Sequence, residues 1–147
     1  MKRLATHIIL ALAAIISLSG CSHNNGDIGY WLGLWHLDSI EIDGTPVTHY
    51  DGNTYFMFQG KVFCIRCVDE AHQSYIESYA QWHESDDHQH VTLTFADENF
   101  KPDVTPLVPL EVVTTLTVDT LTSREMTLKH THSLTGSTLT YHLTRWE

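Results

Sequence analysis

The residues best suited to metal chemistry lie together in one short segment. His83, His88 and His90 surround three carboxylates between residues 84 and 87, and imidazole with carboxylate suits zinc, copper or nickel. Their spacing is irregular and lacks the helical His-Glu-x-x-His pattern of zinc enzymes. We therefore interpret the segment as a solvated acidic turn and keep a metal site formed by these three histidines as an alternative.

Cys64 and Cys67 have the two-residue spacing of a redox or metal-binding pair. They lie in the run 61–68, which has the composition of a β-strand. Three positions apart in a strand, their Cα atoms would be about 10 Å apart with the side chains on opposite faces. That distance exceeds the limit of about 7 Å for a disulfide, so we expect two reduced thiols and no oxidoreductase activity.

Two further histidines have the strand parity of core residues. His130 and His132 alternate in register with the apolar Met126 and Leu128. Both imidazoles then point into a polar part of the core, unless the strand frays before the next turn and exposes them to solvent. Mixed polar and apolar surfaces are typical of ligand pockets. The candidate ligand-binding residues are His130, His132, Tyr141, Leu139 and Phe95.

The sequence lacks the usual catalytic motifs. It contains no nucleophile elbow and no phosphate-binding glycine loop. We also find no pair of carboxylates that neighbouring strands would bring together. We therefore expect a protein that is not an enzyme and that needs no cofactor.

The elements that position these residues are β-strands. From Trp35 onward, short segments rich in Val, Ile, Thr, Tyr and Phe alternate with turn residues, and no long stretch keeps a helical apolar period. Short turns favour an antiparallel up-and-down meander, and eight strands can close into a barrel without exposed edges. The fold class is therefore all-β, an eight-stranded antiparallel barrel. The expected strands are 34–42, 54–58, 61–68, 74–83, 90–96, 112–119, 124–132 and 137–146.

One connection departs from this pattern. The stretch from Asp97 to Glu111 is long, and Pro102, Pro106 and Pro109 disfavour both a helix and a central strand within it. Connections of this length without structure of their own are often lids or binding loops. The alternative is a stiff crossing over the surface.

The N-terminus resembles the signal peptide of a bacterial lipoprotein. Two basic residues precede an apolar run at 8–16, which is far shorter than the roughly 20 residues of a transmembrane helix. The tetrapeptide Leu18-Ser19-Gly20-Cys21 matches the lipobox, which implies cleavage before Cys21 and lipidation of that residue. Two or more acyl chains on Cys21 would anchor the protein stably to a membrane.

This resemblance divides the chain into three parts. We expect a signal peptide at 1–20, a lipidated N-terminus and flexible tether at 21–32, and a barrel domain at 33–147. Tyr30 and Trp31 should mark the place where packing starts. Ser22 is not the aspartate that retains some lipoproteins at the inner membrane, which favours the outer membrane of a Gram-negative cell envelope.

The charge of the chain limits its partners. The 147 residues include 8 basic and 18 acidic ones, and loss of Lys2 and Arg3 with the signal peptide would leave a formal charge of −12. Phosphate contacts need clustered Lys and Arg, so we expect no nucleic acid partner. The mature length suits one domain, and we expect a monomer.

The two ends of the predicted barrel resemble the lipocalin superfamily. Gly33-Leu34-Trp35 opens the first strand, and Arg145 lies on the inward face of the last one. In lipocalins this tryptophan lies at the closed end of the barrel, and an arginine from the final strand packs over it. Such a contact stabilises by about 0.5–2 kcal/mol. The resemblance covers nearly the whole mature chain and extends to small lipocalin-like lipoproteins without assigned activity.

The resemblance implies a function in binding. We expect a membrane-anchored barrel that binds a small apolar or amphipathic ligand at the cell envelope. The alternatives are a structural or protein-interaction module whose barrel is filled by its own side chains, and an extracytoplasmic metal binder built on the histidine-rich segment. Cavity volume separates the first two, because an eight-stranded barrel is either packed solid or holds one small ligand.

Overall fold

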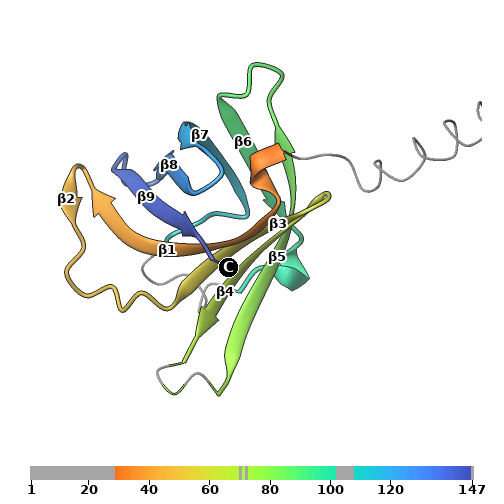
Figure 1. The fold of residues 1–147 in the computed structure, drawn as a ribbon. Coiled ribbons are helices and arrows are strands. Elements are labelled where there is room, and N and C mark those ends of the chain that lie inside the picture. Colours follow the sequence, from red (N-terminus) through yellow and green to blue (C-terminus); the bar gives the residue numbers. More distant parts are fainter. Residues whose placement is uncertain (1–28, 70, 72, 102–107, 147) are drawn as a thin grey trace, which may run out of the picture.

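Eight long antiparallel strands form a closed barrel, the fold class that the strand pattern predicts (Figure 1). The computed structural model describes residues 29–69, 71, 73–101 and 108–146. The elements are η2 (Gly29–Trp31), β1 (Gly33–Ile42), β2 (Thr45–Pro46), β3 (Thr54–Gln59), β4 (Val62–Val68), β5 (Tyr75–Glu84), β6 (His90–Phe95), η3 (Asp97–Asn99), β7 (Val113–Leu121), β8 (Glu125–Thr131) and β9 (Thr138–Arg145). Each of the eight expected strands is present with its ends shifted by at most two residues.

β1 closes the barrel because it pairs with two different strands. Its first residues, Gly33 to His36, pair with β3, and the stretch from Trp35 to Ile42 pairs with β9. A bulge between Leu37 and Ser39 bends the strand, and β1 curves from one side of the barrel to the other in Figure 1. The remaining long strands follow in chain order, each antiparallel to the one before.

β2 is a short strand that the sequence analysis treated as part of a turn. It pairs with the end of β1 through Glu41–Pro46 and Ile42–Thr45. The two intervening residues, Asp43 and Gly44, have φ values of 50° and 78°, as the Asp-Gly turn of a tight hairpin requires. Its proline lies on an unpaired edge, where the missing N–H costs no ladder hydrogen bond.

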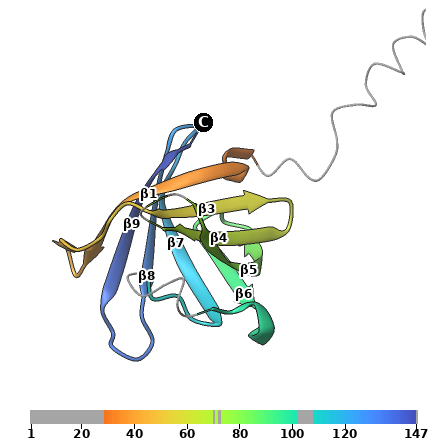
Figure 2. The same cartoon turned by 90° about the horizontal axis from the view of Figure 1, so that it is seen from below.

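Trp31, Trp35 and Arg145 seal the closed end of the barrel. The Arg145 guanidinium carbon lies 4.3 Å from the centroid of the Trp35 ring, which is the contact expected from the sequence. Trp35 Nε1 donates a hydrogen bond to the Trp31 carbonyl at 3.1 Å. Figure 2 shows η2 beside the C-terminal end of β9, at the end of the barrel opposite the β8–β9 turn.

Packing begins at Trp31, where the sequence analysis expected it to start. Gly29–Trp31 forms a 3₁₀ turn within the expected tether at 21–32, and the Trp31 side chain is buried against Phe58 and Trp82. The physical reason is the large apolar area of the indole, which the closed end of the barrel removes from water. The signal peptide, Cys21 and the tether as far as residue 28 lie outside the described residues.

Large side chains fill the interior of the barrel. Aromatic rings meet edge to face at its centre, where Phe56 lies 5.3 Å from Phe63 and 5.9 Å from Tyr141. The largest fully buried side chains are Trp31, Trp35, Tyr141, Phe56, Phe58, Phe63, Leu37, Ile40, Ile65, Leu93, Leu116 and Met126. Strand alternation directs most of these residues inward, whereas Trp31 comes from η2 and the bulge in β1 separates Leu37 from Ile40.

The connection between β6 and β7 packs into the barrel at both of its described ends. Phe100, just after η3, contacts the ring of Phe95 with centroids 5.2 Å apart. Val108 and Leu110, before β7, are buried in the core. The connection is therefore attached to the core at both of its described ends. Residues 102–107 lie outside the described residues.

Cys64 and Cys67 are both free thiols, as expected. Cys67 packs against the core, whereas Cys64 faces outward on β4 and is buried beneath its neighbours. Burial raises the pKa of Cys64 to about 12, so its thiol is protonated at neutral pH.

Within the described part of the chain, no helix is long and apolar enough to cross a membrane.

The closed end generates the first prediction. Gly33 has a φ of +130°, and a Cβ there would lie 2.6 Å from Arg145 Nη1. Gly33→Ala should therefore destabilise the protein by about 1–3 kcal/mol, as overpacking does. In an Arg145→Ala background the steric part of this cost should vanish. A double-mutant cycle by denaturant unfolding measures the coupling.

Gly136→Ala is a matched control for this cycle. Gly136 also has a positive φ, of +71°, but a Cβ at that position meets no atom within 4 Å. The loss of unfolding free energy caused by Gly136→Ala, which comes from the positive φ alone, should be the same with and without Arg145. If Gly33→Ala also shows no coupling to Arg145, then the close approach of glycine and guanidinium does not hold the closed end.

Candidate functional site

A shallow depression lies at the mouth of the barrel, which is the end formed by the β8–β9 turn and the chain before β7. Its volume is about 250 Å³, and it is lined by Ile42, Pro109, His132, Thr135, Ser137 and Leu139. Three separate segments supply these residues: the end of β1, the chain before β7, and the β8–β9 hairpin. Apolar side chains together with histidine and hydroxyl groups suit a molecule with both polar and apolar parts.

His132 stands on the rim of this depression. β8 ends at Thr131, so His132 belongs to the turn and is half-buried. The Leu134 N–H donates to His132 Nδ1 at 3.3 Å. Because Nδ1 accepts this hydrogen bond, the neutral ring carries its proton on Nε2 and has a donor for a bound molecule.

His130 lies inside the barrel, two residues before His132. Only 4% of its surface is exposed. Its Nδ1 lies 3.3 Å from the Thr115 carbonyl oxygen, so Nδ1 is the donor of that hydrogen bond. The sequence analysis left open whether both rings point inward or the strand frays and exposes them. His130 points inward, whereas His132 lies beyond the end of the strand.

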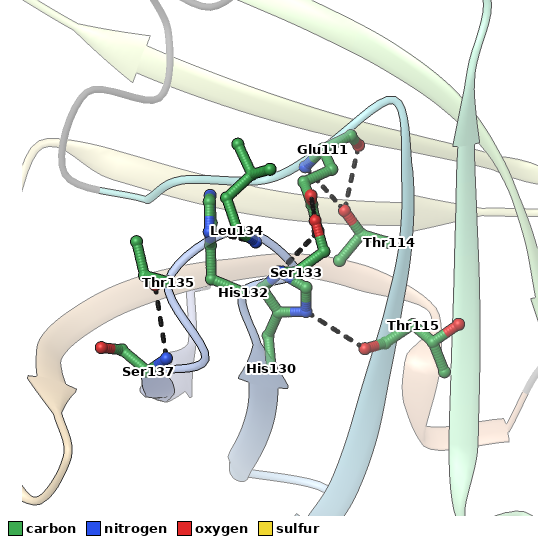
Figure 3. A network of polar contacts seen from close by, with 9 residues as sticks. All are labelled: Glu111, Thr114, Thr115, His130, His132, Ser133, Leu134, Thr135 and Ser137. Atoms are coloured by element: carbon green, nitrogen blue, oxygen red, sulfur yellow. Dashed lines mark hydrogen bonds and ion pairs between the residues drawn. The ribbon is translucent and has the colours of Figure 1, made fainter.

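Glu111 connects His130 to the β8–β9 turn. Figure 3 shows this carboxylate between Ser133 and His130. Ser133 donates to it through Oγ and through its backbone N–H, the latter at 3.4 Å, and the Ser133 hydroxyl holds the pKa of Glu111 below its usual value. His130 Nε2 makes no hydrogen bond to the residues that the structure describes, and it lies 3.5 Å from Glu111 Oε2.

Burial decides the protonation state of His130. Removal of the ring from water lowers its pKa, and this effect outweighs the opposing effects of the Thr115 carbonyl and the Glu111 carboxylate. His132, whose ring centroid is 6.3 Å away, lowers it further. The contact with Glu111 is therefore an ion pair only after His130 takes up a proton.

The other two ligand-binding candidates lie away from the depression. Tyr141 is fully buried next to Phe56, and its hydroxyl group makes no hydrogen bond to the described residues. Burial raises the pKa of this phenol, which is neutral at neutral pH. Phe95 packs between Phe63 and Phe100 on β6. Of the five candidates, only His132 and Leu139 line the depression itself.

The histidine-rich segment forms the β5–β6 hairpin. His88 Nδ1 lies 3.1 Å from Glu84, and His90 Nδ1 lies 3.9 Å from Asp87. His83 lies on β5, outside this turn. Among residues 29–69, 71, 73–101 and 108–146, no group of three or more His, Cys, Asp or Glu side chains is arranged to hold a metal ion.

The sequence analysis missed Glu111, Ser133 and Ile42 at the mouth. Glu111 and Ser133 are 22 positions apart, and no local pattern indicates that their side chains meet. Pro109 was noted only for its effect on the backbone. The one available signal was the length of the connection before β7, which suggested a binding role without naming a residue.

Comparisons with known proteins agree with the architecture. A family model described as a lipocalin-like domain matches residues 16–136. A solved lipocalin-like protein from Bacteroides uniformis ATCC 8492 is similar in fold, with a TM-score of 0.61 and 17% sequence identity over 80% of this chain and 100% of that chain. No curated protein matches the sequence.

The buried imidazole predicts a pH dependence of stability. Because the pKa of His130 is lower in the folded state, unfolded chains bind the extra proton below the ordinary histidine value of 6.5. His130 thus contributes stability that is present above pH 6.5 and is lost as the pH falls through its lower folded pKa. His130→Gln should reduce the slope of unfolding free energy against pH in the range just below pH 6.5.

Denaturant unfolding at a series of pH values measures this slope for the wild type and for His130→Gln. A second histidine variant, measured in the same way, provides the control. His83→Gln removes an exposed imidazole on β5. If both variants change the slope equally, then His130 is not the group responsible. Glu111 has an ordinary pKa of 4.5 that is lowered in the fold, so it titrates below this window.

Proposed function

The chain belongs to the lipocalin-like domain family, and on this premise we propose that it is a membrane-anchored lipoprotein that binds a small amphipathic molecule at the mouth of its barrel. The mixed depression beside His132 and Leu139 carries the proposal. Binding takes place at the mouth because the protein's own aromatic side chains occupy the centre of the barrel.

The depression restricts the size and chemistry of the ligand. Its volume of about 250 Å³ lies below the usual range of roughly 300–1,000 Å³ for ligand pockets. It therefore suits a small molecule, or one end of a larger one. Ile42 and Leu139 would cover an apolar group, while His132 Nε2 and the hydroxyl groups of Thr135 and Ser137 would meet a polar one.

We propose that the protein acts by binding, without catalysis. Lipocalin-like domains are in general binding folds. Ser133 donates directly to the carboxylate of Glu111, and the imidazole of His130 contacts that carboxylate from another side. In a Ser-His-Asp triad the serine hydroxyl is bonded to the histidine, and the carboxylate orients the histidine from its other side. Here the carboxylate lies next to both side chains, so the arrangement of these three residues favours a structural role.

The anchor of the proposed lipoprotein is Cys21. Its lipobox places the domain at the cell envelope, and Ser22 favours the outer membrane. The acidic mature chain is poorly suited to nucleic acid. We propose that it acts there as a monomer.

The filled interior favours a second candidate function. A barrel with Phe56, Phe63 and Tyr141 at its centre has the packing of a structural domain. Such a protein would act through its outer surface as an interaction module. Ligand binding at the mouth distinguishes the two candidates.

The anchoring prediction concerns Cys21→Ser. This change removes the sulfur that would carry diacylglycerol, so the protein should move from the membrane to the soluble fraction and should no longer incorporate a radioactive fatty acid. Ser22→Ala leaves the cysteine in place and should keep the label. Unchanged labelling of Cys21→Ser would show that the protein is not anchored at this residue.

The binding prediction uses an environment-sensitive fluorescent fatty acid. The wild type should bind it. His132→Ala should weaken binding because it removes a polar contact, and Ile42→Glu should weaken binding because it adds a charge to the apolar side of the depression. His83→Ala, an exposed histidine outside the mouth, should bind normally. Circular dichroism checks that each variant is folded. No binding by the wild type would favour the interaction module.

A further inference from the structure

The outer surface of the barrel has two different sides. Antiparallel strands with one solvated face place polar residues outward, and β6, β7 and β8 follow this rule with threonine. These positions alternate with buried residues such as Leu93, Leu116 and Leu128. We call this side the threonine wall, formed by Thr92, Thr94, Thr115, Thr117, Thr127 and Thr131.

The opposite side breaks the rule with one continuous apolar row. Strand pairing places Leu34 of β1 beside Met57 of β3, Met57 beside Cys64 of β4, and Cys64 beside Tyr79 of β5. Trp146 extends the row beyond β9, because its N–H donates to the Leu34 carbonyl at 2.8 Å. We call these five residues the aromatic wall.

The aromatic wall is exposed where its rings are largest. Trp146 is 52% exposed and Tyr79 is 40% exposed. The Trp146 ring is fixed in place by two neighbours, His36 and Tyr55, at centroid distances of 5.6 Å and 5.4 Å. Leu34 and Met57 are half-buried and Cys64 is buried, so the exposed part of the wall is formed mainly by the two separate rings. Exposed tryptophan and tyrosine side chains are typical of membrane interfaces.

The charges beside the aromatic wall are paired with one another. Arg66 forms an ion pair of 2.6 Å with Glu77, and its guanidinium lies 4.7 Å from the centroid of the Tyr75 ring. Tyr79 donates its hydroxyl proton to the same glutamate. Among the described residues, the carboxylates nearest these rings are Glu77 and Asp38, and each lies against a partner side chain, Arg66 and His36 respectively.

The proposed lipid anchor emerges next to this wall. Arg145, which precedes Trp146, donates hydrogen bonds to the carbonyl oxygens of Tyr30 and Leu32. Eight residues, 21–28, connect this point to the lipidated cysteine. Fully extended, they span at most about 29 Å, so an anchored Cys21 keeps this part of the barrel close to the bilayer.

We propose that the aromatic wall rests on the membrane surface, with Trp146 and Tyr79 among the lipid headgroups and the threonine wall in water. The proposal rests on the anchoring described above. Tryptophan and tyrosine suit this position because each combines an apolar ring with a polar group that stays hydrated. The barrel then lies on its side, and its mouth opens along the membrane.

Fluorescence quenching by brominated lipid tests this orientation. The mature lipidated protein is placed in vesicles of phosphatidylethanolamine and phosphatidylglycerol, with and without bromine on the acyl chains. Trp31 and Trp35 are buried and Trp82 is half-buried, so Trp146 is the most exposed of the four tryptophans. Brominated vesicles should reduce the emission, and Trp146→Phe should abolish that loss.

A reporter on the other wall provides the matched control. Thr117→Trp, made in the Trp146→Phe background, places the only comparable indole on the threonine wall and should show no loss of emission. Val62→Glu adds a charge beside the aromatic wall, at an exposed position opposite Gln81, and should reduce quenching of Trp146. Thr117→Glu should leave that quenching unchanged. Circular dichroism establishes that each variant is folded.

An artificial anchor separates this proposal from the anchoring itself. Cys21→Ser with an N-terminal histidine tag is bound to vesicles containing a nickel-chelating lipid. If native protein fails to float with vesicles but the tagged protein is quenched through Trp146, then lipidation is wrong and the orientation stands. Absence of quenching in the anchored protein overturns the orientation, as does equal quenching of the Thr117→Trp reporter. Self-association that Val62→Glu abolishes in sedimentation also overturns it.

Discussion

The contact between Arg145 and Trp35 is the interaction on which the closed barrel depends. The guanidinium covers the indole and donates to the carbonyl oxygens of Tyr30, Leu32 and Ser123. One side chain thereby joins the last strand to the first strand, to the N-terminal turn and to the β7–β8 turn. A lysine could not replace it, because an ammonium group lacks the planar fork that reaches several acceptors at once.

Closure of the barrel determines where a ligand can bind. With its edges paired, the sheet directs one residue of every two into a narrow interior, and these side chains are large enough to fill it. His130 donates to the Thr115 carbonyl of β7 from inside the barrel. The chain before β7 also brings Glu111 next to it at the mouth. Apolar side chains and polar groups consequently lie side by side at the mouth of the barrel.

The same alternation that builds the core leaves the outer surface free to vary. Threonine on one side satisfies strand propensity and remains polar, whereas Leu34, Met57 and Trp146 form an apolar surface on the other. Nothing in the stability of the barrel requires this difference. The proposed lipid anchor at Cys21 would make the two sides of the barrel inequivalent, and such an asymmetry would give a physical reason for the two walls.

The sequence by itself determined the strands, the closed end and the fate of the cysteines. Period-2 alternation and turn residues are local signals, so β3 to β9 could be located without knowledge of their partners. Parity placed Cys64 and Cys67 on opposite faces and directed His130 inward. The pair Gly33-Leu34-Trp35 and Arg145 was informative because the first and last strands of a closed meander must meet.

Only the tertiary structure decided which side chains share a site. Glu111 meets Ser133 and His130 because the chain just before β7 lies at the mouth, and no local periodicity encodes that position. The row from Trp146 to Tyr79 depends on the register of four strand pairings, each set by turns and bulges. A shift of one residue in any pairing would break the row. Local sequence patterns therefore specify the strands. The register of the strands and the positions of the connections specify which side chains meet at the mouth and along the aromatic wall.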